Sequence, residues 1–272
     1  MQLNSCKRLN IKRIKKDLNI NGFTIIKNFF TNSELNKIDQ TLINIILSIS
    51  KDGRFKNIKK LNTVRFTKLY SKLKKEKPKI AGAIYDSMQI SLYLQSLFTS
   101  QKITNLISGI LKINETNISN FFRTLRLDLP GKSNNLLSWH QDFMHSNNRN
   151  LNSDRGITIW APINSVNENT GSMKICVSSH KKRLKIKLDK KKFLNSSEYL
   201  DIDNTKLSKF QKIIITCKRK DIVLMNMNCV HCSTEGKLNL IRRTIISRYI
   251  DINSNGFVPG ASKFIPSINI KK

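Results

Sequence analysis

Two histidines and an aspartate carry the most specific chemical signal in this sequence. His140 and Asp142 lie two residues apart at the end of a short extended segment, 136–142. Because side chains alternate along a strand, an imidazole and a carboxylate at this spacing share a face and could bind one metal ion. His231 follows a second apolar segment, 221–230. Two histidines and one carboxylate form the facial triad that suits non-haem Fe(II) and leaves metal positions open for substrate and oxygen.

The composition indicates a globular protein built around an ordinary core. The chain has 272 residues, of which 39% are hydrophobic and 7% are aromatic, enough for one large domain. Its five cysteines form no disulfide framework, which favours a reducing compartment. No apolar run approaches the ~20 residues of a membrane span, and the basic N-terminus lacks the apolar region of a signal peptide. We therefore expect a cytoplasmic protein without a membrane span.

The net charge is strongly positive and raises an alternative function. The chain carries 49 basic and 18 acidic residues, a formal charge of +31, which would suit nucleic acid or an acidic membrane surface. The lysines are dispersed, however, and only 7–16 and 181–192 form basic patches. A generally solvated basic surface is favoured, and no specific nucleic-acid partner is expected. A nucleic-acid-binding or base-demethylating oxygenase is the alternative.

Helical patterns come first along the chain, and strand patterns follow. Apolar spacing predicts helices over 33–50, 79–99 and 101–112, whereas 54–77 is charged and loop-like. Strands are predicted at 22–30, 118–129, 156–163, 172–177, 213–217, 221–227 and 240–250. This order indicates a single α+β domain, 1–272, in which a helical part (about 1–113) packs on a β-sandwich or barrel (about 114–252) and a tail (253–272) follows. The basic stretch 181–212 is read as an insertion or lid.

Four motifs in this order resemble the phytanoyl-CoA dioxygenase family of Fe(II)/2-oxoglutarate-dependent oxygenases over nearly the whole chain. The first is Gly22-Phe23-Thr24-Ile25-Ile26 with Phe29-Phe30 and the helix after it. The second is Trp139-His140-Gln141-Asp142, and the third runs from Glu168-Asn169-Thr170-Gly171 to Ser178-Ser179-His180. The fourth runs from Asp221 through His231 to Arg242.

The resemblance implies a fold, a set of cofactors and a reaction. The fold would be a double-stranded β-helix, or jelly-roll, and His140, Asp142 and His231 would hold Fe(II). Arg242, eleven residues after His231, would bind the distal carboxylate of the co-substrate 2-oxoglutarate. Trp160 and Ser233 match positions that line the family's co-substrate pocket. The implied reaction uses O2, converts 2-oxoglutarate to succinate and CO2, and hydroxylates a small organic molecule that the sequence does not identify. The carboxylate of Asp142 favours hydroxylation over halogenation, because related halogenases carry a small residue there.

Several competing interpretations stay open. Cys229 and Cys232 have a spacing known from zinc sites, although no second cysteine pair completes one. A metal-free binding module with the same fold is a further alternative. Arg242 and Arg243 must face opposite ways on a strand, one into the barrel and one to solvent. Arg242 could instead pair with a core acid such as Asp128 or Asp221. Arg248 shares the face of Arg242, and its role is open.

Overall fold

The computed structural model describes residues 9–131, 136–145, 155–184, 186–188, 200–202 and 204–254. Residues 185 and 189–192 of the basic segment 181–192 lie outside the described residues. Residues 7 and 8 of the N-terminal patch and most of the predicted tail lie outside them as well. No helix among the described residues is both long enough and apolar enough to cross a membrane.

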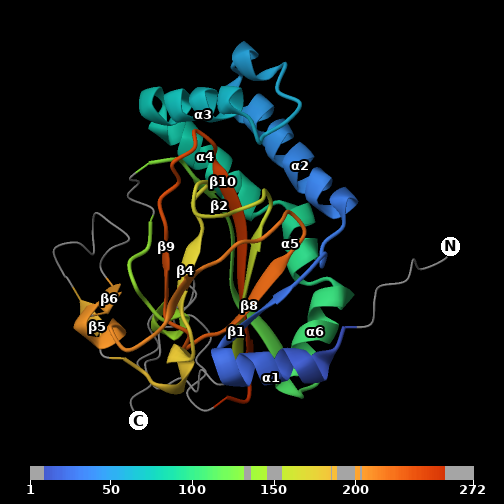
Figure 1. The fold of residues 1–272 in the computed structure, drawn as a ribbon. Coiled ribbons are helices and arrows are strands. Elements are labelled where there is room, and N and C mark those ends of the chain that lie inside the picture. The colour runs from blue at the N-terminus through green and yellow to red at the C-terminus, as the bar shows by residue number, and fades with distance from the viewer. Residues whose placement is uncertain are drawn as a thin grey trace, which may run out of the picture.

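Antiparallel strands form two principal sheets (Figure 1). The larger sheet has the order β1 (Phe23–Ile26), β8 (Ile222–Asn226), β3 (Gly156–Pro162), β10 (Arg242–Asp251) and β2 (Ile118–Asp128). The smaller sheet has the order β7 (Lys212–Ile214), β4 (Met173–Cys176) and β9 (His231–Ser233), and a separate pair joins β5 (Ile186–Leu188) to β6 (Leu200–Ile202). All neighbouring strands run antiparallel. The chain is therefore an α+β protein, as the sequence predicted, and its sheets are antiparallel.

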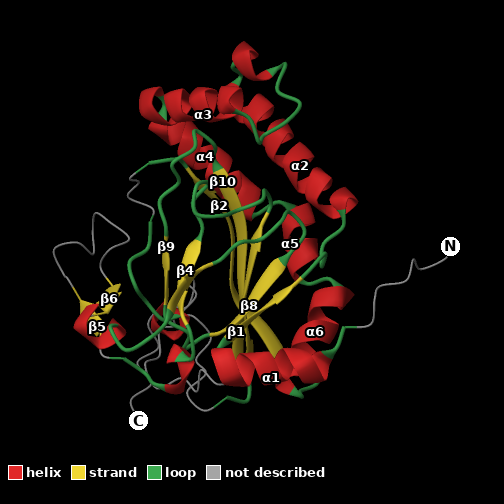
Figure 2. Ribbon diagram, in the orientation of Figure 1, coloured by secondary structure: helices red, strands yellow, loops and turns green. Residues whose placement is uncertain are grey.

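Helices cover one side of the larger sheet (Figure 2). They are α1 (Ile11–Asn21), α2 (Asn32–Ser50), α3 (Val64–Glu76), α4 (Pro78–Gln89), α5 (Leu92–Phe98) and α6 (Gln101–Leu111). Short 3-10 turns lie at Gly53–Phe55, Glu115–Asn117, Asp142–His145, Ser179–Lys181 and Asn204–Leu207. All helices longer than one turn precede β2 along the described chain, which agrees with the predicted order of helices before most strands.

Alternation along the central strands assigns their side chains to two separate cores. On β3, Ile157, Ile159 and Ala161 pack with the helices in one cluster, while Trp160 belongs to a second cluster. That second cluster also contains Met173 of β4, from the smaller sheet. The larger sheet is thus covered on both faces, by helices on one and by the smaller sheet on the other. This explains why β3 is buried at every position.

Side-chain capping defines the start of α2. The Thr31 hydroxyl accepts a hydrogen bond from the Glu34 backbone N–H at 3.1 Å, and the Glu34 carboxylate accepts one from the Thr31 backbone N–H at 2.6 Å. This reciprocal capping box satisfies two donors that a helix start would otherwise leave unpaired. Leu35, Ile38 and Leu42 on the apolar stripe are then buried.

The predicted loop over 54–77 is wrong for its second half, where α3 forms. Phe66, Tyr70 and Leu73 lie at helical spacing and are buried, but the lysines between them make the segment look polar. The predicted helix 79–99 is also divided in two, because Ser91 caps a new helix with its side chain. Packing against the sheet and the other helices selects both features, and single-sequence periodicity registers them weakly.

Gly22 is required by both its backbone angle and its surroundings. It ends α1 at φ +84°, and its N–H donates to the Leu18 carbonyl. A Cβ built at this position would lie 2.6 Å from Nδ1 of His180, whose Nε2 lies 3.1 Å from the Asn19 carbonyl oxygen. No other residue type fits this turn without strain.

We expect Gly22→Ala to lower the free energy of unfolding by at least ~1–2 kcal/mol, the cost of a left-handed conformation for an L-residue. Gly82→Ala is the matched control. Gly82 lies in α4, and a Cβ there would meet nothing within 4 Å, so its replacement should raise stability by ~0.5–1 kcal/mol. Urea unfolding of the two variants measures both effects. Equal changes in the two variants would contradict this account of Gly22.

Candidate metal centre

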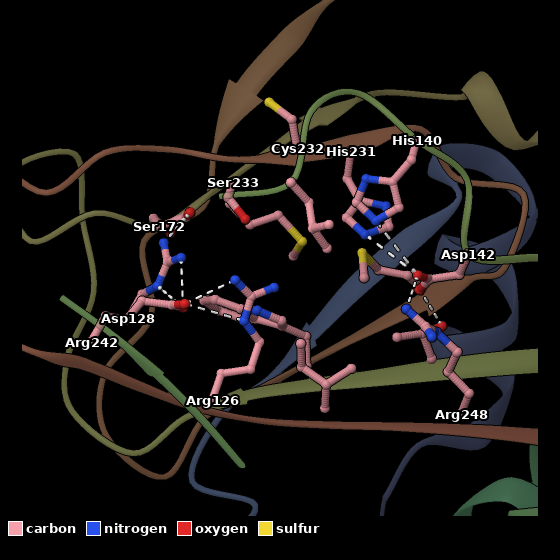
Figure 3. Close-up of a pocket in the computed structure, with 16 residues that line it drawn as sticks. Arg126, Asp128, His140, Asp142, Ser172, His231, Cys232, Ser233, Arg242 and Arg248 are labelled. Carbon is pink, nitrogen blue, oxygen red and sulfur yellow. Dashed lines mark hydrogen bonds and ion pairs between the residues drawn. The ribbon is translucent and has the colours of Figure 1, made fainter. Parts of the chain in front are cut away.

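Backbone pairing brings the two histidines together. His140 and His231 form an isolated antiparallel bridge, with N–H to carbonyl distances of 2.9 and 3.0 Å in the two directions. Asp142, two residues after His140, opens a 3-10 turn. Nε2 of each histidine lies 3.8 Å from Oδ1 of Asp142. All three side chains are buried, and their potential ligand atoms lie within 4.8 Å of one another (Figure 3).

Carbonyl groups determine which imidazole nitrogen carries the proton. Nδ1 of His140 lies 2.7 Å from the Ser138 carbonyl oxygen, and Nδ1 of His231 lies 3.0 Å from the Cys229 carbonyl oxygen. A carbonyl can only accept, so each Nδ1 is the protonated donor, and in the neutral ring Nε2 presents its lone pair to Asp142. This is the arrangement that orients histidine ligands at metal sites. Two nitrogen donors and one carboxylate fit a divalent transition metal such as iron.

Two side chains that the sequence left unassigned orient the Asp142 carboxylate. The Thr158 hydroxyl donates to Oδ2 at 2.6 Å, and Nη2 of Arg248 donates to Oδ1 at 2.5 Å. The Arg248 guanidinium also stacks on the Phe122 ring, 4.2 Å from its centroid. Thr158 lies two residues before Trp160 on β3, so strand alternation could have indicated that it faces the same cavity.

One cavity is lined by all six residues that the sequence singled out. Besides His140, Asp142 and His231, its wall includes Trp160, Ser233 and Arg242. Trp160 comes from the larger sheet and Ser233 from the smaller one, so the cavity lies between the two sheets. The structure therefore brings the six residues together around one cavity.

Arg242 is buried and pairs with Asp128 (Figure 3). Its Nε and Nη2 donate to Oδ2 of Asp128 at 3.2 and 2.9 Å. Arg126 donates to the other carboxylate oxygen, with Nη2 at 2.8 Å. Burial alone would raise the pKa of the Asp128 carboxyl, but Arg126 and Arg242 outweigh it and hold this pKa below its ordinary value. Of the two acids considered for Arg242, Asp221 is instead paired with Lys27.

Arg243 faces away from the cavity, as strand alternation requires, but the expectation that it reaches solvent is wrong. Its side chain is 1% exposed, and its Nη1 contacts Oδ1 of Asp39 on α2. The reason is that α2 covers this face of the sheet, so an outward-facing residue on β10 is still buried. Every residue of β10 is buried, which the alternation of its sequence does not reveal.

The cysteines lie outside the cluster of potential metal ligands in the described chain. Burial raises the pKa values of the Cys229 and Cys232 thiols to about 12. Without a bound metal such thiols stay protonated, and neither belongs to the ligand cluster. The geometry therefore gives no support to the zinc interpretation.

The lowered pKa of Asp128 predicts a specific pH dependence of stability. A carboxyl whose folded pKa is depressed stabilises the fold above its unfolded pKa, and this contribution is lost as the pH falls through the folded pKa. We expect the difference in free energy of unfolding between wild type and Asp128→Asn to be constant above about pH 5 and to shrink below about pH 4. Urea unfolding across this range measures it. If the difference in free energy of unfolding does not change with pH, ionisation of Asp128 does not stabilise the fold.

Comparison with known proteins identifies a family and a shared fold. Residues 18–243 match the family described as Phytanoyl-CoA dioxygenase (PhyH), whereas a search of curated proteins found no match. Solved structures share the fold at low identity. The epimerase SnoN in complex with Fe3+, alpha ketoglutarate and nogalamycin RO is 12% identical, with a TM-score of 0.62 and coverage of 96% of this chain and 91% of that one.

Two further structures show the same fold. The non-heme monooxygenase ThoJ is 14% identical with a TM-score of 0.60, over 91% of this chain and 80% of ThoJ. EctD from S. alaskensis with bound Fe is 13% identical with a TM-score of 0.58, over 93% of this chain and 80% of EctD. The match over 18–243 spans most of the chain, and the chain therefore belongs to the phytanoyl-CoA dioxygenase family of Fe(II)/2-oxoglutarate-dependent enzymes.

Proposed function

We propose that His140, Asp142 and His231 hold a single Fe(II). The observation that carries this proposal is a buried cluster of two imidazole nitrogens and one carboxylate oxygen. Nε2 of His140 and Nε2 of His231 each lie 3.8 Å from Oδ1 of Asp142. Arg248 and Thr158 hold the Asp142 carboxylate in this position, where one of its oxygens faces both imidazoles. The fixed Nδ1 donors support the same assignment, since they pre-orient both imidazoles.

The co-substrate site is proposed on the same cavity. Arg242 would bind the distal carboxylate of 2-oxoglutarate through its planar guanidinium, which matches a carboxylate in charge and shape. Trp160 would form an apolar wall of this site, and the Ser233 hydroxyl would supply a hydrogen bond. These three assignments are supported by the position of the residues, which line the same cavity as the two histidines and Asp142.

The proposed reaction is hydroxylation of a small organic substrate, coupled to conversion of 2-oxoglutarate to succinate and CO2. Bound iron and 2-oxoglutarate would supply the oxidising chemistry, as in the family. The chain's own contribution is to orient the metal ligands, to line the cavity with apolar side chains such as Trp160, Met173 and Ile246, and to hold the co-substrate. The retained Asp142 carboxylate supports hydroxylation. Similar structures include an epimerase and a monooxygenase, so the fold alone does not select the outcome.

The two facing antiparallel sheets support a double-stranded β-helix as the scaffold.

The central test is metal-dependent turnover. We expect purified protein to bind one Fe(II) per chain and to release succinate from 2-oxoglutarate, and His231→Ala to lose both properties while its circular dichroism stays unchanged. His180→Gln is the matched control, because His180 contacts the end of α1 and lies outside the metal cluster. Normal succinate formation by His231→Ala would remove the basis of the proposal. Once a substrate is found, a product that gains one oxygen atom would identify hydroxylation.

A second test addresses the orientation of Asp142. Thr158→Val keeps the side-chain shape but removes the donor to Oδ2, and loss of such a partner typically weakens metal binding by about 10–100-fold. Thr244→Val is the control, because the buried Thr244 hydroxyl has no hydrogen-bond partner within the described residues. Mn(II) titration by calorimetry compares the two variants. Equal affinities would show that Thr158 does not orient the ligand.

A further inference from the structure

The proposed co-substrate arginine is already engaged by the protein's own groups. A guanidinium has five N–H donors. In Arg242, Nε and Nη2 donate to Oδ2 of Asp128, and Nη1 donates to the carbonyl oxygens of Ser172 at 2.5 Å and Thr234 at 3.2 Å. Four of the five donors therefore have acceptors within the described chain. The two-pronged edge formed by Nε and Nη2, which would suit a ligand carboxylate, is occupied by Asp128.

Asp128 belongs to a buried cluster with an uneven charge. Its Oδ1 accepts from Arg126 and its Oδ2 accepts from Arg242, so one carboxylate lies between two guanidinium groups. Arginine keeps its charge in proteins, and one negative charge between two positive charges leaves a net positive charge on the cluster. Asp128 is 4% exposed, so water screens these charges poorly. Arg126, Asp128 and Arg242 all line the cavity that holds the metal-ligand candidates.

We propose that Asp128 is an internal competitor for Arg242, which sets the affinity of the site for the distal carboxylate of 2-oxoglutarate. The inference rests on the proposed function and adds a specificity-determining residue to it. An incoming carboxylate must share Arg242 with Asp128 or displace it from the Nε and Nη2 edge. The net positive charge of the cluster accommodates one further negative charge and favours a 2-oxo acid with a distal carboxylate over one without it.

The proposal predicts that replacing Asp128 and replacing Arg126 change the affinity for 2-oxoglutarate in opposite directions. Asp128→Asn keeps the size of the side chain but removes the competing charge, so 2-oxoglutarate should bind about tenfold more tightly, although the fold loses stability. Arg126→Gln leaves Asp128 with Arg242 as its main partner and makes the cluster neutral. Binding of 2-oxoglutarate should then weaken by about tenfold or more. A purely structural role for Asp128 would instead lower the affinity in both variants.

The experiment is calorimetric titration of Mn(II)-loaded protein with 2-oxoglutarate and, separately, with 2-oxopentanoate. The second ligand keeps the 2-oxo acid but lacks the distal carboxylate, so its affinity should not change in either variant. Asp221→Asn is the matched control variant. Asp221 is a second buried aspartate, which contacts Lys27 and the backbone N–H groups of Asn28 and Lys218 outside the cavity, and its replacement should leave both affinities unchanged.

The outcomes separate this inference from the proposed function. If wild-type protein binds Mn(II) and 2-oxoglutarate but Asp128→Asn binds 2-oxoglutarate no more tightly, the competitor role is wrong and the proposed function stands. If wild-type protein does not bind 2-oxoglutarate, both fall. If Asp128→Asn does not fold, Arg126→Gln decides the matter. Weaker binding of 2-oxoglutarate with unchanged binding of 2-oxopentanoate supports the inference, and unchanged binding of both overturns it.

Discussion

The short antiparallel bridge between His140 and His231 is the contact on which the site depends. Two backbone hydrogen bonds join segments that are far apart in the sequence. They place both imidazoles beside Asp142, and two local carbonyl groups then fix the ring nitrogens that face it. Gln141, between the ligand candidates, is fully buried and donates to the carbonyl of Asn228, in the segment that leads to His231. The backbone therefore determines the geometry before any metal is present.

Strand β10 determines how charge is distributed around this site. Its three arginines each contact a carboxylate from another element: Arg242 contacts Asp128, Arg243 contacts Asp39, and Arg248 contacts Asp142. All three guanidinium groups are buried, and buried charges are tolerated only when they are paired.

The three arginine–aspartate pairs lie on opposite faces of β10 and have two different roles. Arg243 joins β10 to α2 and thereby attaches the sheet to the helical layer. Arg242 and Arg248 face the opposite side and contact Asp128 and Asp142 at the wall of the cavity. The alternation of a single strand thus links the stability of the helical layer to the arrangement of the site, because a shift of register by one residue would exchange the two sets.

The sequence by itself determined the ligand candidates and the general architecture. The spacing of His140 and Asp142, the position of His231 and the strand alternation at Arg242 are local properties, so they could be predicted without coordinates. The helical stripe of α2 and its capping signal are local as well. The order of helices before strands, with the motifs, indicated an α+β protein of this family.

Only the tertiary structure decided which distant groups meet. Asp128 contacts Arg242, Thr158 contacts Asp142, and Arg243 is buried under α2. None of these follows from local spacing, because each joins separate elements whose packing creates the contact. The failure to predict α3 has a different reason: its apolar residues lie at helical spacing, but the lysines between them make the segment look polar until packing buries the apolar side. Charge pairing inside a fold is likewise a property of burial, which a single sequence does not specify.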